Sequence, residues 1–225
     1  MAKQSEKIKS LPKSKDTQDS DFIIAKPEKT SNNELCLFAC EVVFFENICQ
    51  RKRNLHTLII IGQYGIKSLN GISNLIQLRE LWIVECLLKD ISELQSYNSK
   101  LEKLYLYSNK IDHIPNLSNC PELILLNLSG NNISQLRNLH SMPKLREFHL
   151  ANNRIRMIGD AFRDNSSLST VNMAGNPLYQ LTVVTIIRIL KNKMMFYNML
   201  WHKNSDLSTK SLKNHLKQRN LTTAT

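Results

Sequence analysis

The sequence predicts an α/β solenoid: a curved parallel β-sheet on the concave face, short helical or 3-10 turns on the convex face, and a helical C-terminal tail. The first observation is the phrase LEKLYLYSNKI at 101–111, whose leucines stand at relative positions 1, 4 and 6, followed by an asparagine at 9 and an isoleucine at 11. Neither a helix nor a lone strand buries residues with that spacing. The second observation is that the phrase recurs five more times, with successive starts separated by 22 or 23 residues.

The six copies start at a leucine, and positions four and six of each copy are apolar. The starting residues are Leu55, Leu78, Leu101, Leu123, Leu145 and Leu168. This pattern matches the leucine-rich repeat template, in which asparagine or cysteine is expected at position nine. Stacked turns of this kind share backbone hydrogen bonds between parallel strands and enclose one continuous apolar core.

Position nine of the repeats carries a side chain that we expect to turn inward at the end of each strand. An amide there can both donate to and accept from backbone groups that the sheet no longer satisfies. We therefore predict a structural ladder made of Cys86, Asn109, Asn131, Asn153 and Asn176. The first repeat is irregular, because it has Gln63 at this position and its next apolar residue, Ile66, comes one place late.

The chain divides into four predicted segments. Residues 1–30 are polar and mixed in charge, which predicts a disordered tail. Residues 31–53 contain the apolar run ELCLFACEVVFFENIC and are expected to cover the open edge of the first turn, as a helix or an irregular cap. Residues 54–180 hold the six repeats, and 181–225 form a basic tail or cap that is expected to be helical over 181–202.

Composition favours a reduced intracellular environment. None of the apolar runs approaches the ~18 residues of a transmembrane helix, and the first residues lack the apolar middle of a signal peptide. The five cysteines are an odd number, as expected of thiols rather than a disulfide framework. We therefore expect a cytoplasmic protein without a transmembrane segment, with the nucleus or a cilium as alternatives.

No catalytic or cofactor-binding motif accompanies the repeats. The sequence has no phosphate loop, no HExxH and no nucleophile elbow, and its six histidines stand at unrelated repeat positions. Cys36 and Cys40 are spaced like metal ligands on a helix, but no second pair follows, so a buried cap is favoured over zinc. The expectation is a protein that is not an enzyme and that has no metal site and no cofactor.

The predicted protein-binding site lies on the concave face of the sheet. Strand positions three, five and seven point away from the buried leucines, so they line this face. Exposed aromatic residues grouped on a rigid surface are typical of interface hot spots. The alternative is that they cover neighbouring backbone or pack against the N-terminal segment. The predicted binding residues are Ile59, Ile61, Glu80, Trp82, Val84, Lys103, Tyr105, Tyr107, Leu125, Asn127 and His149.

The C-terminal tail offers a rival function. Residues 181–225 hold eight basic side chains and one acid, or +7 of the chain's net +11. Such a tail could act as an adaptor for nucleic acid, an acidic membrane or a cytoskeletal filament. A helix face that closes the last repeat with solvated charges is the favoured interpretation, and nucleic acid is disfavoured because no recognition motif accompanies the charge.

Two stretches carry a family resemblance. QLRELWIVECLLKDI (77–91) and LEKLYLYSNKI (101–111) resemble the SDS22-like class of leucine-rich repeat proteins, and within it the amino-terminal repeats of the leucine-rich repeat-containing protein 9 family. KNKMMFYNM (191–199) is similar to a helical stretch that follows those repeats in that family. The resemblance implies a non-catalytic binding subunit. Members of the class act on protein phosphatase 1 or axonemal dynein, so a phosphatase or an axonemal component is an expected kind of partner.

Overall fold

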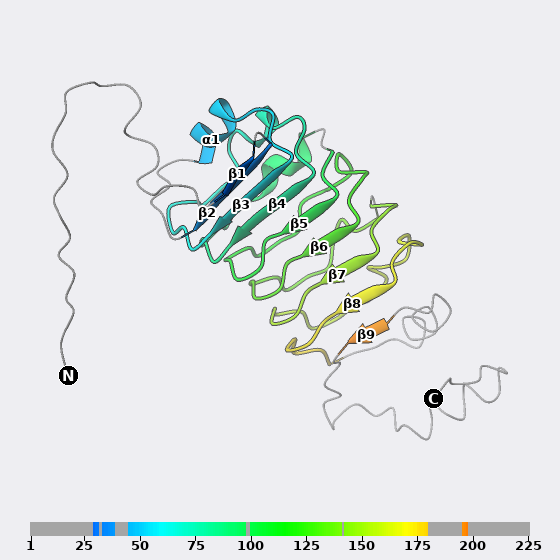
Figure 1. The fold of residues 1–225 in the computed structure, drawn as a ribbon. Helices are drawn as coiled ribbons and strands as arrows, with labels where there is room; N and C mark the ends of the chain where they lie inside the picture. Colours follow the sequence, from blue (N-terminus) through cyan, green and yellow to red (C-terminus); the bar gives the residue numbers. More distant parts are fainter. Residues whose placement is uncertain are drawn as a thin grey trace, which may run out of the picture.

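In the computed structural model, the chain is described over residues 29–31, 33–38, 45–97, 100–140, 142–179 and 195–197. These residues form a nine-stranded sheet in which every strand lies beside its neighbours in chain order (Figure 1). The strands are β1 (Lys29–Ser31), β2 (Glu34–Phe38), β3 (Thr57–Ile61), β4 (Glu80–Val84), β5 (Lys103–Tyr105), β6 (Leu125–Asn127), β7 (Glu147–His149), β8 (Thr170–Asn172) and β9 (Met195–Tyr197).

The six repeats supply β3 to β8, one strand each, and all six run parallel. Equivalent positions lie side by side, so that Leu58 is beside Leu81 and Leu81 is beside Leu104. A shift of one residue would turn the leucines to the solvent, so the repeat pattern itself sets the register. The leucine-rich repeat solenoid predicted from the sequence is confirmed.

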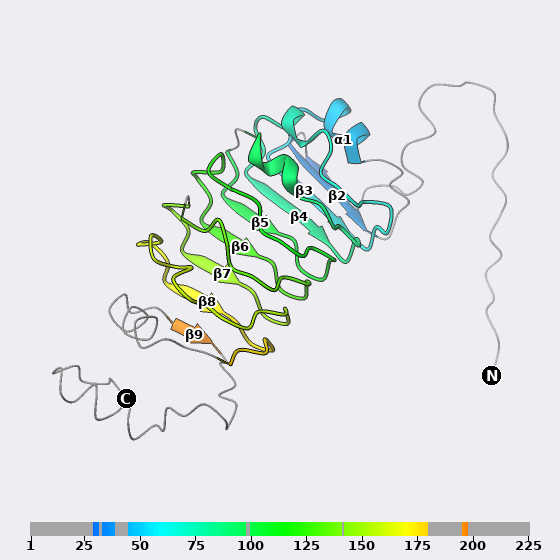
Figure 2. The ribbon, with the colours of Figure 1, turned by 180° about the vertical axis from the view of Figure 1, so that it is seen from behind.

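One apolar core runs through the whole solenoid from Leu35 to Met173. The convex side returns each chain segment through short turns, which include the 3-10 helices η1 (Ile72–Asn74) and η2 (Ser92–Gln95) (Figure 2). Each of them buries one apolar residue, Ile72 or Leu94, against the back of the sheet. The repeats are too short for longer helices on this side, because 22 or 23 residues must contain a strand, two bends and the return.

The chain turns sharply after each strand through a left-handed residue at position eight. All six residues at this position have positive φ, which L-amino acids other than glycine seldom adopt. They are Gly62 (φ 72°), Glu85 (55°), Ser108 (57°), Gly130 (67°), Asn152 (55°) and Gly175 (70°). This turn directs the side chain at position nine back under the sheet.

The N-terminal end of the solenoid differs in part from the helix or irregular cap expected over 31–53, because Glu34–Phe38 is a strand, although a helix follows it. Strand β2 pairs parallel to β3, so the sheet gains a strand before the first repeat, and β1 pairs antiparallel to its outer edge. Helix α1 (Phe45–Arg51) follows and places Phe45, Ile48 and Cys49 in the core. The first repeat therefore has no open edge.

The C-terminal end also differs from expectation. Met195–Tyr197 lies within the predicted helix of 181–202, but the structure has strand β9 there, paired parallel to β8. The helix prediction is wrong for these three residues, and the rest of the predicted tail lies outside the described residues. The predicted disordered segment also lies outside them, except that Lys29 and Thr30 belong to β1.

Among the residues that the structure describes, none of the helices combines the length and the apolar content that a membrane span requires.

Candidate functional site

Three rows of side chains line the concave face of the sheet. Because the parallel strands are in register, equivalent positions of successive repeats form continuous rows across them. Position three gives Glu34, Thr57, Glu80, Lys103, Leu125, Glu147 and Thr170. Position five gives Cys36, Ile59, Trp82, Tyr105, Asn127, His149 and Asn172. Position seven gives Phe38, Ile61, Val84, Tyr107, Ser129, Ala151 and Ala174.

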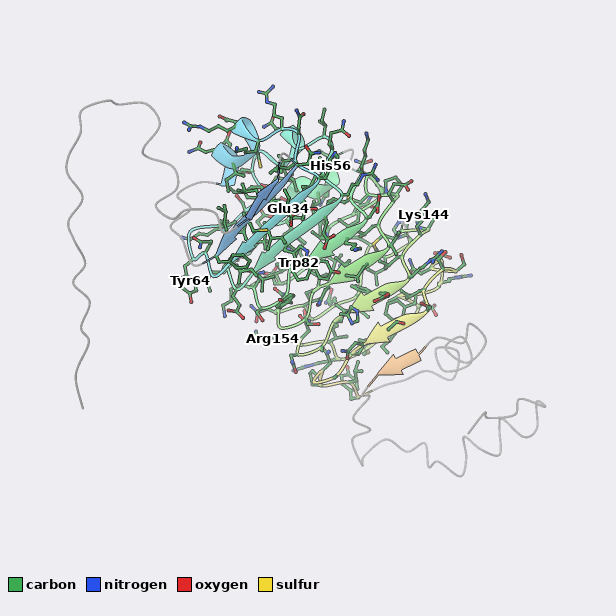
Figure 3. All side chains as sticks on the ribbon, viewed as in Figure 1. Glu34, His56, Tyr64, Trp82, Lys144 and Arg154 are labelled. Carbon is green, nitrogen blue, oxygen red and sulfur yellow. The ribbon has the colours of Figure 1, made fainter. Side chains whose placement is uncertain are left out.

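Three of these residues, Trp82, Tyr105 and Tyr107, form an aromatic cluster, and Trp82 is labelled in Figure 3. The rings of Trp82 and Tyr105 stack, with centroids 3.7 Å apart and planes inclined by 20°. The ring of Tyr107 meets Trp82 edge-on, with centroids 6.5 Å apart and planes at 76°. Stacked and edge-to-face pairs are both favourable, and each contributes about 0.5–1.5 kcal/mol beyond the burial of area. The three rings therefore stabilise one another on the sheet.

Glu80 and Lys103 fix the orientation of the aromatic cluster. The indole N–H of Trp82 donates a hydrogen bond of 2.7 Å to Oε1 of Glu80. The other carboxylate oxygen of Glu80 lies 3.5 Å from Nζ of Lys103, and the two side chains remain 26% and 47% exposed. Since the indole N–H is satisfied within the face itself, a partner can cover the ring without leaving that donor unpaired.

The hydroxyl of Tyr105 stays protonated at neutral pH. Partial burial raises its pKa, and the nearby carboxylate of Glu80 raises it further. The aromatic cluster therefore presents neutral rings and a hydroxyl group rather than a phenolate charge.

Apolar residues extend the aromatic cluster toward the N-terminal end. Ile59 and Ile61 of β3 are half-buried, and Phe38 of β2 is 39% exposed. Val84 is different, because it is only 1% exposed. The prediction that Val84 contributes accessible surface is therefore wrong: this part of the face is covered by its surroundings.

The contribution of β2 to this face was not predicted from the sequence. The repeat spacing nevertheless extends to this strand, because Leu35 and Leu37 precede the inward residues Leu58 and Ile60 by 23 residues. By the same count Cys40 falls at position nine, as Cys86 does, although Cys40 lies outside the described residues. The spacing of Cys36 and Cys40 thus follows from the repeat, and the described residues contain no group of side chains suited to hold a metal ion.

The second half of the concave face is small and polar. Oδ1 of Asn127 accepts from the backbone N–H of Ser129, and Oδ1 of Asn172 accepts from that of Ala174, each at 3.1 Å. His149 lies with Nε2 3.6 Å from the carboxylate of Glu147. Leu125 is the half-buried apolar residue of this half. The structure thus places all the predicted binding residues on one face, but divides them into an apolar and a polar part.

The position-nine residues lie on the other side of the sheet, where they form hydrogen bonds between successive turns of the solenoid. Oδ1 of Asn109 accepts from the backbone N–H groups of Cys86 and Leu88, at 3.1 and 3.0 Å, and its Nδ2 donates to the carbonyl of Ile83 at 2.7 Å. Asn131, Asn153 and Asn176 repeat this arrangement one turn later each. Each amide joins its own turn to the preceding one.

The thiol of Cys86 occupies the same place in the second repeat. Its Sγ donates to the carbonyl of Val84 at 3.0 Å and accepts from the N–H of Gln63 at 3.4 Å. Burial raises its pKa to about 11, and burial raises that of Cys49 to about 12. Both thiols are therefore protonated and unreactive at neutral pH. None of the described cysteines forms a disulfide.

Comparison with known proteins identifies the fold but not a family. No protein-family model matches the chain, and no curated protein matches it. The solved structures that match include an internalin (inlF) of Listeria monocytogenes, with 20% identity and a TM-score of 0.56 over 69% of this chain and 44% of that one. They also include the LRR protein LIC12759 of Leptospira interrogans, with 20% identity and a TM-score of 0.56 over 74% and 48%.

This chain thus spans less than half the length of either structure. At this level of identity the match concerns the fold alone. Together with the six repeats and their register, it establishes that the chain has the leucine-rich repeat fold.

Proposed function

We propose that the chain is a non-catalytic protein-binding module whose partner docks on the concave face, over the aromatic cluster. The observation that supports this proposal is the stack of Trp82 on Tyr105, held by Glu80 on a rigid sheet and still partly exposed. Tryptophan and tyrosine dominate the energetic centres of protein interfaces, since they bury large areas at a small entropic cost. A preordered aromatic cluster of this kind lowers that cost further.

The resemblance of residues 77–91 and 101–111 supports a finer proposal. We propose that the chain belongs to the SDS22-like class. A phosphatase catalytic subunit or an axonemal dynein component is then the first partner to test, and a cytoplasmic or ciliary location is the first to examine. A pull-down with purified protein phosphatase 1 catalytic subunit tests the phosphatase version directly. Failure to retain that subunit would remove this partner without affecting the broader proposal.

The broader proposal is tested by a matched pair of double variants. Trp82→Ala with Tyr105→Ala removes the stacked rings from the concave face. Tyr64→Ala with Tyr179→Ala removes two aromatic side chains that are 69% and 63% exposed outside the three concave rows. The probe is a pool of random twelve-residue peptides displayed on phage and selected against the wild-type chain.

The first double variant should weaken binding of the selected peptides at least about thirtyfold, as expected when two hot-spot residues are removed. The second should leave their affinity within about twofold. Circular dichroism checks that both variants remain folded. If the Trp82 and Tyr105 variant unfolds, single Trp82→Phe and Tyr105→Phe variants repeat the comparison. Peptides that bind all variants equally would show that the face is not a recognition site.

The alternative function assigns binding to the basic C-terminal tail. Its charge of +7 over 181–225 favours an anionic surface. Binding of acidic vesicles or of nucleic acid by the wild-type chain, undiminished in the Trp82 and Tyr105 variant, would favour the tail as the functional element.

A further inference from the structure

The concave face differs in charge from the rest of the chain. The whole protein has a net charge of +11. The three concave rows, however, contain three carboxylates, Glu34, Glu80 and Glu147, and a single ammonium group, Lys103. These three rows are therefore net negative on a positive molecule.

Two of these carboxylates are not neutralised by a lysine or arginine whose side chain the structure describes. Glu80 is held by Trp82 and paired with Lys103, so its charge is largely neutralised. Neither Glu34 nor Glu147 pairs with a lysine or arginine among the described residues; the basic group beside Glu147 is His149, which is charged only when protonated. The side chain of Glu147 is 48% exposed. A cation of a partner can reach it at little desolvation cost.

The spacing of the strands fixes where that cation must stand. Trp82 is on β4 and Glu147 is on β7, so three strand spacings of about 4.8 Å, or about 14 Å in all, separate their strands. Trp82 and Tyr105 stand at position five and Glu147 at position three, which adds an offset of two residues, or about 7 Å, along the strands. The separation from Glu147 is therefore about 16 Å for Trp82 and about 12 Å for Tyr105, on β5. An extended peptide advances about 3.3 Å per residue, so these distances correspond to about five and about four residues.

The path between the two points crosses β6, where position three carries Leu125 and position five carries Asn127. Leu125 is half-buried, and Oδ1 of Asn127 accepts from the backbone N–H of Ser129. Beside this path, position seven carries the small residues Ser129, Ala151 and Ala174. A chain that crosses the strands here thus gains an apolar contact with Leu125 and is flanked by a row of small side chains.

We infer that the concave face binds an extended protein segment in which a lysine or arginine stands four or five residues from an apolar anchor. The anchor covers the aromatic cluster, and the basic side chain pairs with Glu147. This inference rests on the proposed function and specifies the partner class for the same site. An acidic segment is rejected, because its carboxylates would face Glu147 and Glu34.

The test uses the same displayed peptides and one matched pair of variants. Peptides selected on the full-length wild-type chain are sequenced, and the strongest binder is synthesised. Glu147→Gln removes the carboxylate at the site. Glu122→Gln is the control, since Glu122 is a similarly exposed carboxylate, 47%, that pairs with Lys144 outside the three concave rows.

The inference predicts that selected peptides are enriched in lysine or arginine four or five positions from an aromatic or aliphatic residue. It also predicts that Glu147→Gln weakens the synthetic peptide about tenfold, that Glu122→Gln changes its affinity less than twofold, and that raising the salt concentration reduces the difference. A charge swap, Glu147→Lys with the basic residue of the peptide changed to glutamate, should recover binding.

Three results would overturn the inference. Peptides that depend on Trp82 but are neutral or acidic would leave the proposed function intact and refute the partner class. Trp82-dependent dimerisation of the wild-type chain, measured by light scattering, would assign the face to a second copy instead. A selection that yields no Trp82-dependent peptide would refute the proposed function itself, and this inference with it.

Discussion

At the scale of single residues, the inward amides hold the solenoid together. Asn131 accepts from the backbone N–H of Ile111 at 3.0 Å and donates to the carbonyls of Leu106 and Leu128, each at 2.9 Å. Its place was predictable from the sequence, because the amide follows each strand at a fixed position. The left-handed residue before it was not expected from the sequence, since position eight varies between glycine, glutamate, serine and asparagine.

Asn131→Ala should lower the free energy of unfolding by about 2–4 kcal/mol. The alanine leaves buried backbone groups of two turns without partners, and each such group costs about 1–3 kcal/mol. Asn132→Ala, one residue further and more exposed, should change it by no more than about 0.5 kcal/mol. Urea denaturation followed by circular dichroism measures both. Equal effects of the two variants would mean that the amide ladder does not stabilise the fold.

The buried thiols give the protein a pH dependence on the alkaline side. The folded state raises the pKa of Cys86 from its ordinary value of 9.0 to about 11. A thiol whose pKa is raised by folding stabilises the protein below pH 9, and this contribution declines as the pH rises toward 11. The free energy of unfolding should therefore fall over this interval, and fall less steeply in Cys86→Ala. A slope unchanged by that substitution would show that Cys86 is not responsible.

The same protonation predicts slow chemical labelling. At pH 8, iodoacetamide should modify Cys49 and Cys86 at least about a hundredfold more slowly in the folded chain than after unfolding in guanidinium chloride, because the thiolate is the nucleophile. Peptide mass spectrometry identifies each modified residue. Rapid labelling of Cys49 in the folded protein would contradict its burial against the first repeat.

At the scale of elements, the regular repeats were predictable and the two ends were not. Inside the solenoid, each strand has the same neighbours, so periodicity decides the structure of β3 to β8. At the ends, tertiary pairing overrides local preference. Met195–Tyr197 belongs to a stretch rich in helix-forming residues, yet it pairs as β9 with the last repeat. The sequence ELCLF is equally compatible with part of a cap and with a strand. It forms a strand here because it pairs with β3.

The contact between α1 and η1 depends on Gly71. This residue has φ +88°, and a Cβ atom placed on it would lie 3.1 Å from the Cα atom of Glu46 in α1. Gly71→Ala should therefore destabilise the protein by about 2–4 kcal/mol, through the left-handed backbone and the displaced helix.

Gly159→Ala is the matched control for this contact. Gly159 also has positive φ, +53°, but a Cβ atom there would meet nothing within 4 Å. Gly159→Ala should lower the free energy of unfolding by only about 1–2 kcal/mol, because the left-handed backbone is then the single source of strain. Thermal unfolding of the two variants measures the difference. If Gly159→Ala is as harmful as Gly71→Ala, the close approach of α1 contributes nothing.

At the scale of the whole molecule, the two faces of the sheet have different roles, one in stability and one in forming a surface. The leucines and amides hold the turns together, while the alternate side chains are free to form a surface. The sequence predicted which residues share this surface, since alternation along a strand determines it. It could not predict that Val84 is covered, because burial depends on side chains of neighbouring strands. Nor could it predict that Trp82 stacks on Tyr105 and bonds to Glu80, since these contacts join residues of different repeats or depend on rotamers.

The fluorescence of Trp82 tests the central claim most directly. The chain has two tryptophans, so the Trp201→Phe variant reports on Trp82 alone. In the free protein, acrylamide should quench this residue, since it is partly exposed on the concave face. The selected peptide should reduce the quenching constant severalfold and saturably, whereas a scrambled peptide should not. A peptide that binds while the quenching of Trp82 stays unchanged would contradict the account.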